Sequence, residues 1–223
     1  RLKKEFALLG LNVSRRRIGR LMEQAGLACK TKRRFKATTD SRHTKSIAPN
    51  VLDRQFEVSQ QDRYYVGDIT YSATSEGWLY LAVVIDLFSR RVVGWSMDSR
   101  MKSKLVNDAL LMALWKRKPK DGLTWHTDRG SQYASDSHRR IIKEHHIVQS
   151  MSRRGNCWDN AVSESFFHSL KTELVHHYQF KTRADAKQTI FEYIEVFYNR
   201  ERLHSTNGYL SPVDYEKQHL LAA

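Results

Sequence analysis

Hydrophobic and polar positions divide the chain into three parts. Residues 1–27 have the apolar spacing of helices, residues 28–50 are basic and poor in apolar residues, and residues 51–223 alternate strand-like and helix-like segments. The middle part has the composition of a linker and ends in Pro49-Asn50. We therefore expect a small helical segment, a basic linker and a larger folded domain.

Two short helices are predicted ahead of the linker. The first, "RLKKEFALLG", ends at Gly10, and the second, "SRRRIGRLMEQAG", begins after the N-cap residue Ser14 and ends at Gly26. An i, i+3, i+4, i+7 spacing in the second helix predicts one buried stripe, made of Ile18, Leu21, Met22 and Ala25. The pattern is typical of a helix-turn-helix, and equally of a helical hairpin with a solvated basic face. Because the first helix begins abruptly at Arg1, we expect further sequence upstream.

The larger domain is predicted to be an α/β domain with a mixed five-stranded sheet. Strands are expected in the segments "RYYVGDITYSA", "WLYLAVVIDLF", "RRVVGWSM", "LTWHTD" and "IVQSMS". Helices are expected in "SKLVNDALLMALWKRK", in "SDSHRRIIKEHH", and over residues 159–177 and 182–198, before a tail ending "SPVDYEKQHLL". Three strands in succession, followed by alternating helices and strands, favour this fold class.

The charge of the chain indicates a polyanionic partner. Lys and Arg outnumber Asp and Glu by 38 to 24, giving a net charge of +14. The sequence contains no apolar run near the roughly 20 residues of a membrane span and no signal-peptide pattern, so nucleic acid is favoured over a membrane surface. The two cysteines lack zinc-finger spacing, which fits a reducing cytosol.

Four acidic residues stand out by their place in the pattern. Asp68 lies inside an otherwise uncharged strand, where an unpaired carboxylate is costly. Asp86 ends a strand and could cap a turn, and Asp128 follows the fourth strand, where it is either a turn residue or one arm of a metal site. If the first and fourth strands are neighbours, Asp68 and Asp128 converge, and a helix can add Glu164. Three such oxygen ligands suit a pair of Mg²⁺ or Mn²⁺ ions and an in-line phosphoryl displacement.

Spacing alone does not select these residues. Asp128 and Glu164 have 35 residues between them. The same interval separates three other pairs, Asp40/Glu76, Asp108/Glu144 and Asp159/Glu195. Among the four pairs, only Asp128 follows a strand while its partner lies on a helix, so the structural context favours this pair.

The helix that carries Glu164 has an apolar stripe suited to packing on the sheet, formed by Val162, Phe166 and Leu170. Glu164 points away from this stripe, and Asn160 and Lys171 are predicted to share its face. Such a row of amide, carboxylate and ammonium could hold a metal ion and an adjacent phosphate. The alternative is an exposed polar face with no function.

Further basic residues are candidates for contacts with nucleic acid. In "SRRGNCWDN", Arg153 and Arg154 could clamp backbone phosphates, while Trp158 is expected to pack against the helix rather than to stack on a base. Phosphate contacts are also expected from the second helix and the linker, at Arg15, Arg16, Arg17, Lys32, Arg33 and Arg34.

An ordered series of motifs carries a family resemblance. The segments "VGDITY", "VVIDLFSRRVVGW", "HTDRGSQY", "SMSRRGNCWDNAVSESFFHSLKTEL" and "FYNRERLHSTNGYLSPVDYE" together resemble the DDE recombinase core of bacterial insertion-sequence transposases. The most similar group is the one whose catalytic protein comes from the second of two overlapping reading frames. One departure is Tyr65, where the family often has Trp.

The resemblance implies a ribonuclease-H-like fold, similar to retroviral integrase, from about residue 50 to the end of the sequence. It implies that Asp68, Asp128 and Glu164 are the catalytic triad and the ligands of two Mg²⁺ or Mn²⁺ ions, and that Lys171 contacts DNA. The expected reaction is cleavage at the 3′ ends of the element followed by strand transfer into target DNA.

The resemblance also implies partners and a location. We expect double-stranded DNA of the terminal repeats and the target, joining of the element ends through a circular intermediate, a homo-oligomer on the DNA, an upstream-frame partner protein, and a place in the bacterial cytoplasm at the nucleoid. Two alternatives stay open. One is a ribonuclease-H-like nuclease without strand transfer, and the other is a non-catalytic DNA-binding regulator.

Overall fold

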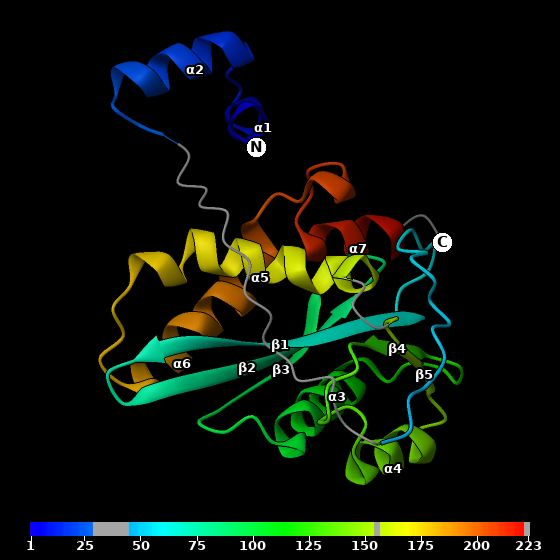
Figure 1. Cartoon of the computed structure of the whole chain (residues 1–223). Helices are drawn as coiled ribbons and strands as arrows, with labels where there is room; N and C mark the ends of the chain where they lie inside the picture. Colours follow the sequence, from blue (N-terminus) through cyan, green and yellow to red (C-terminus); the bar gives the residue numbers. More distant parts are fainter. Residues whose placement is uncertain (29–44, 154–156, 221–223) are drawn as a thin grey trace.

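A five-stranded mixed sheet forms the centre of the folded domain (Figure 1). The computed structural model describes residues 1–28, 45–153 and 157–220. The strands are β1 Tyr64–Thr74, β2 Gly77–Asp86, β3 Val92–Asp98, β4 Thr124–Thr127 and β5 Val148–Met151. Their order is β3-β2-β1-β4-β5, with β1, β2 and β3 antiparallel and β4 and β5 parallel to β1. The predicted α/β fold with a mixed five-stranded sheet is confirmed.

Helices cover both faces of this sheet (Figure 1). The α-helices are α1 Leu2–Leu8, α2 Arg15–Gln24, α3 Ser103–Arg117, α4 Asp136–Glu144, α5 Ala161–Glu173, α6 Arg183–Glu192 and α7 Pro212–Leu220. Helix α3 packs on β2 and β3 and contacts α4, whereas α5 and α6 pack on β1 from the other side. No helix among the described residues has both the length and the apolar character needed to cross a bilayer.

Strand alternation divides the core into two layers. Tyr65 and Ile69 of β1 face the layer under α3 and α4, while Val66 faces the layer under α5 and α6. The strand also carries Gly67, where a Cβ atom would overlap the indole of Trp125. The absence of a side chain at Gly67 therefore lets β4 and β1 pair closely beside a large buried ring.

Residues 211–220, predicted as part of a tail, form the helix α7 instead. Ser211 accepts a hydrogen bond from the backbone N–H of Asp214, and Pro212 occupies the first helical position. This is a common N-terminal signature of a helix. The prediction was wrong because the apolar stripe of the helix is weak, and the helix is held largely by charge.

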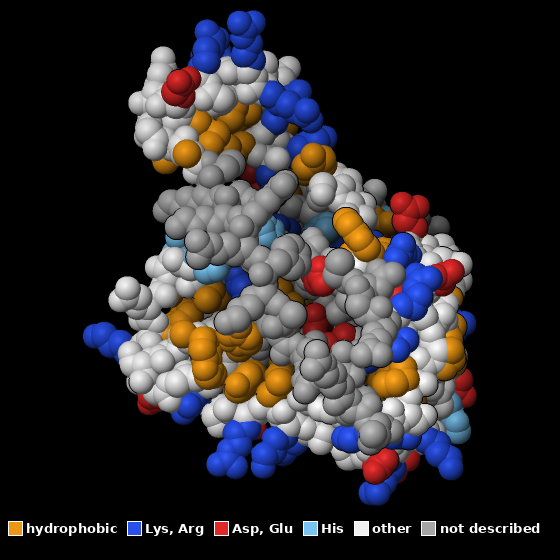
Figure 2. Space-filling view, viewed as in Figure 1, with side chains coloured by type: hydrophobic (Ala, Val, Ile, Leu, Met, Phe, Trp, Pro, Cys, Tyr) orange, Lys and Arg blue, Asp and Glu red, His pale blue; other side chains and the backbone are white. Residues whose placement is uncertain are grey.

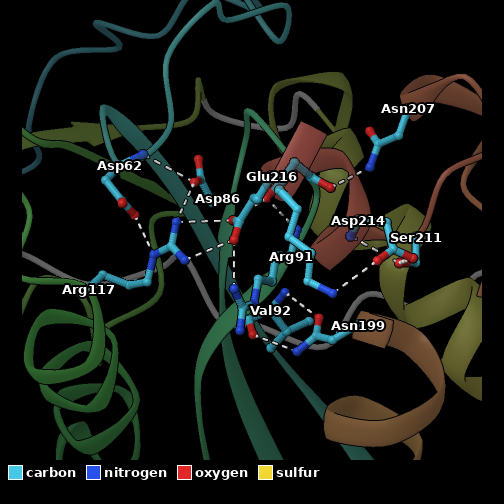
Figure 3. A network of polar contacts seen from close by, with 12 residues as sticks. Asp62, Asp86, Arg91, Val92, Arg117, Asn199, Asn207, Ser211, Asp214 and Glu216 are labelled. Carbon is cyan, nitrogen blue, oxygen red and sulfur yellow. Dashed lines mark hydrogen bonds and ion pairs between the residues drawn. The ribbon is translucent and has the colours of Figure 1, made fainter. Parts of the chain in front are cut away.

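A buried polar network joins α7 to the sheet and to α3 (Figure 3). The carboxylate of Glu216, only 4% exposed, accepts hydrogen bonds from Ser89, Arg91 and Arg117. Arg117 also donates from Nε to Asp62 at 2.8 Å. Two guanidinium groups thus neutralise one buried carboxylate, which fixes α7 to elements far away in the sequence.

Helices α1 and α2 form where they were predicted, and Ser14 caps α2 by accepting from the backbone N–H of Arg17 at 3.2 Å. The predicted buried stripe of α2 is wrong except at Ile18, because Leu21 is 48% exposed, Met22 is half-buried and Ala25 is exposed. A pair of short helices buries only part of such a stripe unless a third element covers it.

Two other helix predictions need new boundaries. The helix predicted over residues 159–177 is a 3₁₀ turn Cys157–Asn160, the helix α5, and a second 3₁₀ turn Val175–His177. The helix predicted over 182–198 is α6 followed by a π-helix, Tyr193–Glu201. In the π-helix the Asn199 side chain accepts from the N–H of Val92 and donates to its carbonyl, both at 3.0 Å, so the wider turn is coupled to β3 (Figure 3).

Candidate active site

The sheet brings Asp68 and Asp128 to the same level. Strands β1 and β4 are parallel neighbours, and their last paired residues are Gly67 and Thr127. Asp68 is the next residue of β1 and Asp128 follows the last residue of β4, while β1 continues to Thr74 paired with β2. The predicted condition for their convergence, that the first and fourth strands are neighbours, is confirmed.

Backbone amides hold both carboxylates in defined orientations. An Asp68 oxygen accepts from the N–H of Ile69 at 2.7 Å, and an Asp128 oxygen accepts from the N–H of Gly130 at 2.9 Å. A Cβ atom at Gly130 would lie 3.0 Å from the same Asp128 oxygen, so glycine suits this turn. Asp128 therefore does serve a turn, and the turn also fixes the position of its carboxylate beside Asp68.

The pKa of Asp68 is shifted by burial and by the charges of three neighbouring side chains. Burial raises the pKa of Asp68 well above its usual value, the charges of Asp128 and Glu164 raise it further, and Lys171 opposes the shift. Burial likewise raises the pKa of Glu164. Asp128, Glu164 and Lys171 are thus near enough to Asp68 for their charges to act on its carboxylate.

Helix α5 supplies Glu164 because its other face is buried. Phe166 and Leu170 are 2% and 0% exposed against the sheet, and Val162 is half-buried, so the predicted apolar stripe is confirmed. Glu164 lies off that stripe and is half-buried.

The row of Asn160, Glu164 and Lys171 on one helix face stays a prediction. Asn160 is buried, with no hydrogen-bond partner for its side-chain oxygen among the described residues, because it ends the 3₁₀ turn that precedes α5. Lys171 lies over the ring of Tyr71, with 5.2 Å from its ammonium to the ring centroid.

Arg153 is bound to carboxylates in this structure. Its guanidinium donates to both oxygens of Asp159 at 2.9 and 2.8 Å and lies 3.1 Å from Asp53. The hydrogen bond from Arg153 is the largest cause of the low pKa of Asp159, which also accepts from Arg54 at 2.9 Å. The clamp at Asp159, which sequence reasoning missed, fixes the approach to α5 and engages all three nitrogens of the Arg153 guanidinium.

Trp158 is 69% exposed, so the prediction that it packs against the helix is wrong. The 3₁₀ turn directs its neighbour Asp159 inward, and Trp158 consequently faces solvent.

Asp86 and His126, whose roles the sequence left open, both have structural contacts. Asp86 accepts from the backbone N–H groups of Asp62 and Phe88, and burial raises its pKa to about 7. His126 is buried between Ser150 and Ser152.

The remaining candidates for nucleic-acid contacts are spread over the chain. Arg15, Arg16 and Arg17 are exposed on α2. Arg154, Lys32, Arg33 and Arg34 lie outside the described residues. The last part of the predicted linker packs on the domain, because Ile47 and Ala48 lie against the core.

Similar folds occur among retroviral integrases. The simian T-cell lymphotropic virus intasome in complex with the PP2A regulatory subunit B56 gamma matches with a TM-score of 0.60 at 17% identity, over 79% of this chain and 60% of that chain. The catalytic core of BIV integrase matches with a TM-score of 0.53 at 16% identity, over 73% and 99%. The HTLV-2 integrase core in complex with magnesium (trimeric form) matches with a TM-score of 0.50 at 16% identity, over 69% and 95%. The fold is therefore the predicted ribonuclease-H-like integrase core.

Relatives with much higher identity align along almost the whole chain. An uncharacterized 31 kDa protein of insertion element IS600 from Shigella sonnei is 46% identical over 100% of this chain and 82% of its own length. The transposase for insertion sequence element IS904 from Lactococcus lactis subsp. lactis is 45% identical over 97% and 86%. Transposase InsF for insertion sequence IS3A from Escherichia coli K12 is 44% identical over 99% and 76%.

Two integrase core domain families match adjacent parts of the chain, residues 58–157 and residues 164–220. Together they span more than half of it and include all five strands and most of the helix α5. The first match contains Asp68 and Asp128, and the second begins at Glu164. With the high identity to full-length relatives, these matches show that the chain belongs to the insertion-sequence transposases that have an integrase core domain.

Proposed function

We propose that this transposase cleaves the 3′ ends of its element and joins them to target DNA with divalent metal ions held by Asp68, Asp128 and Glu164. The observation that carries the proposal is that the pairing of β1 with β4, and the packing of α5 on β1, bring Asp128 and Glu164 near enough to raise the pKa of the buried Asp68. A pure DNA-binding regulator has no need of a buried carboxylate with two acidic neighbours.

The site suits hard divalent cations by its chemistry. A buried carboxylate with two acidic neighbours is electrostatically costly, and a cation offsets that cost. The described residues contain no group of three or more acidic, His or Cys side chains already close enough to hold an ion. We infer that Asp68 and Asp128 provide the fixed ligands and that Glu164 completes the set. When bound, two Mg²⁺ or Mn²⁺ ions supply the Lewis acidity that in-line phosphoryl displacement requires.

The protein's own groups orient the substrate in this proposal. The N–H groups of Ile69 and Gly130 each bind one oxygen of Asp68 and Asp128 and so fix the two carboxylates for metal binding. Lys171 is positioned to bind a phosphate next to the scissile bond. The buried stripe of α5 keeps Glu164 in place relative to the sheet.

Partners and location belong to the same proposal. One solved neighbour is described as a magnesium complex and another as an intasome, which supports Mg²⁺ as the cofactor and an oligomer on DNA for this chain. We infer double-stranded DNA of the terminal repeats and target as substrate, an upstream-frame product as partner, and a bacterial cytoplasmic location at the nucleoid.

Nicking and strand joining on supercoiled plasmid, with Mg²⁺ or Mn²⁺, test the proposal. We expect metal-dependent nicked and joined products from the wild type and none from Glu164→Gln. Nicked products without joined products would favour a nuclease that lacks strand transfer. Equal activity of the two proteins would overturn the assignment of Glu164.

A further inference from the structure

An aromatic cluster lies on the β1–β2 hairpin, beyond the carboxylates. Tyr71 pairs with Tyr80 across the two strands, and Trp78 follows on the same face next to them. The Tyr71 and Trp78 rings meet edge to face at 4.8 Å, and the Tyr71 and Tyr80 centroids are 6.4 Å apart. Figure 2 shows hydrophobic side chains exposed over this hairpin, with acidic side chains near the middle of the same view. Trp78 is 50% exposed, so much of its surface faces solvent.

Lys171 connects this cluster to the candidate active site. Its ammonium lies 5.2 Å from the Tyr71 ring centroid. Burial lowers the pKa of Lys171 and the charge of Asp68 opposes that shift, so the same ammonium is also near Asp68. Tyr71 is three residues after Asp68 on β1, which corresponds to about 10 Å along a strand.

Hairpin stability explains only part of the cluster. Cross-strand aromatic pairs stabilise antiparallel strands, and the Tyr71–Tyr80 pair has this effect. It does not require a half-exposed Trp78 at the start of β2, in contact with Tyr71, or a cation over the Tyr71 ring. A flat ring beside an ammonium suits a nucleotide, because the base stacks on the ring while the phosphate meets the charge.

We propose that Tyr71 and Trp78, together with Lys171, form a stacking site for an unpaired base of the DNA strand whose phosphate lies at Asp68. The inference rests on the proposed function, since it takes that strand as the substrate. Strand alternation directs Asp68 and Tyr71 to opposite faces of β1, and Lys171 is the residue that is near both. Through Lys171 the stacked base is linked to the reacting phosphate, and the site selects DNA ends that are locally unpaired.

Binding of two duplexes tests this site. Both have the same length and the same labelled strand, but in one the last three base pairs of one end are mismatched. Fluorescence anisotropy in EDTA measures binding without cleavage. We expect the wild type to prefer the mismatched duplex, and Trp78→Ala to weaken binding of that duplex by about 5- to 100-fold, as the loss of one stacked base implies. Binding of the paired duplex stays unchanged.

Three further variants separate stacking from folding. Trp78→Phe retains a flat ring and keeps the preference, whereas Trp78→Leu retains apolar volume without a flat ring and loses it. Trp115→Ala removes a tryptophan that is 78% exposed on α3, and binds both duplexes as the wild type does. If Trp78→Ala is unstable, the comparison of Trp78→Phe with Trp78→Leu still shows whether the preference for the mismatched duplex needs a flat ring.

Two results overturn the inference. One is a wild type without preference for the mismatched end, and the other is a Trp78→Leu variant that binds both duplexes like the wild type. Either would assign the cluster to hairpin stability or to a protein contact. Neither depends on cleavage, so the assignment of Asp68, Asp128 and Glu164 is tested separately by plasmid joining.

Discussion

Asp68 and Asp128 leave neighbouring parallel strands at the same level, one residue beyond the Gly67–Thr127 pair. The register of β1 and β4, rather than any local sequence motif, sets the distance between the two carboxylates. A site built on strand ends in this way is as rigid as the sheet. Variants that leave the sheet intact therefore report on chemistry alone.

Replacing Asp68 by Asn should abolish strand joining. Loss of a metal ligand removes several kcal/mol of transition-state stabilisation, which corresponds to at least about 1000-fold in rate. Affinity for duplex DNA should stay within about twofold, because phosphate contacts dominate it. The matched control is Asp108→Asn, an exposed carboxylate paired with Lys104, which should keep full activity in the plasmid assay. Joining by Asp68→Asn would contradict the triad.

Divalent ions should stabilise the wild type against heat and leave Asp68→Asn unaffected. A ligand that binds only the folded protein adds RT ln(1 + [L]/Kd) to the free energy of unfolding, about 2.7 kcal/mol at 100 times Kd. Without metal, Asp68→Asn should be the more stable protein, because it removes a buried charge from beside Asp128 and Glu164. Calorimetric melting with Mn²⁺ or EDTA measures both effects. A metal-free Asp68→Asn that melts below the wild type would exclude the like-charge explanation.

The ion pair of Glu173 with Arg202 should give the protein a loss of stability in acid. Burial alone would raise the pKa of Glu173, but hydrogen bonds from Arg202 and Arg1 outweigh it and lower the pKa to about 2. The pair therefore stabilises the fold fully above about pH 4.5, the ordinary value for Glu, and the contribution is lost as the pH falls toward 2.

Glu173→Gln tests this ion pair by chemical denaturation between pH 2 and 7. The variant should be less stable than the wild type by on the order of 3 kcal/mol at pH 7, following the shift of the pKa. The two stabilities should converge near pH 2. A difference that does not change with pH would mean that the carboxylate contributes by packing rather than by charge.

Gly94→Ala should destabilise the domain through the contact of α3 with β3. A Cβ atom at Gly94 would overlap the carbonyl of Ala109 and lie 2.8 Å from the Cβ of Ala113, so the helix must move outward. We expect a loss of about 1–3 kcal/mol in urea unfolding. Gly19→Ala on α2, where a Cβ meets nothing within 4 Å, is the control and should be neutral or slightly stabilising.

Removing the three exposed arginines at the start of α2 should make DNA binding less salt-dependent. The triple substitution of Arg15, Arg16 and Arg17 by Gln removes up to three phosphate contacts, so the log–log slope of affinity against salt should fall by up to about 3. Titration of a duplex between 50 and 200 mM salt measures the slope. An unchanged slope would assign α2 to protein contacts.

The sequence predicted the five strands because they depend on local alternation, and the pairing of β1 with β4 then met the condition set for Asp68 and Asp128. Strand-like runs mark β1, β2, β3, β4 and β5, and the ends of parallel neighbours meet at one edge. Glu164 was found because the apolar stripe of its helix assigns it to the other face.

The features that the sequence did not predict depend on contacts between distant residues. The helix α7 is held by Glu216, whose partners Arg91 and Arg117 are remote in sequence. Leu21 is exposed because no element within residues 1–28, 45–153 and 157–220 covers it, which an amphipathic pattern cannot reveal. The enclosure of Arg153 by Asp159 depends on a single 3₁₀ turn, whose geometry decides that Trp158 faces outward.

The link between Arg117 and Glu216 also bears on when the protein becomes competent during synthesis. The two residues are 99 positions apart, so a ribosome adding about 5–20 residues per second delivers the carboxylate about 5–20 s after the arginine. Until then, Arg91 lacks the carboxylate of Glu216, and Arg117 has only its partners Asp62 and Asp86. The nascent transposase therefore completes its domain late, which delays its first encounter with DNA in a folded state.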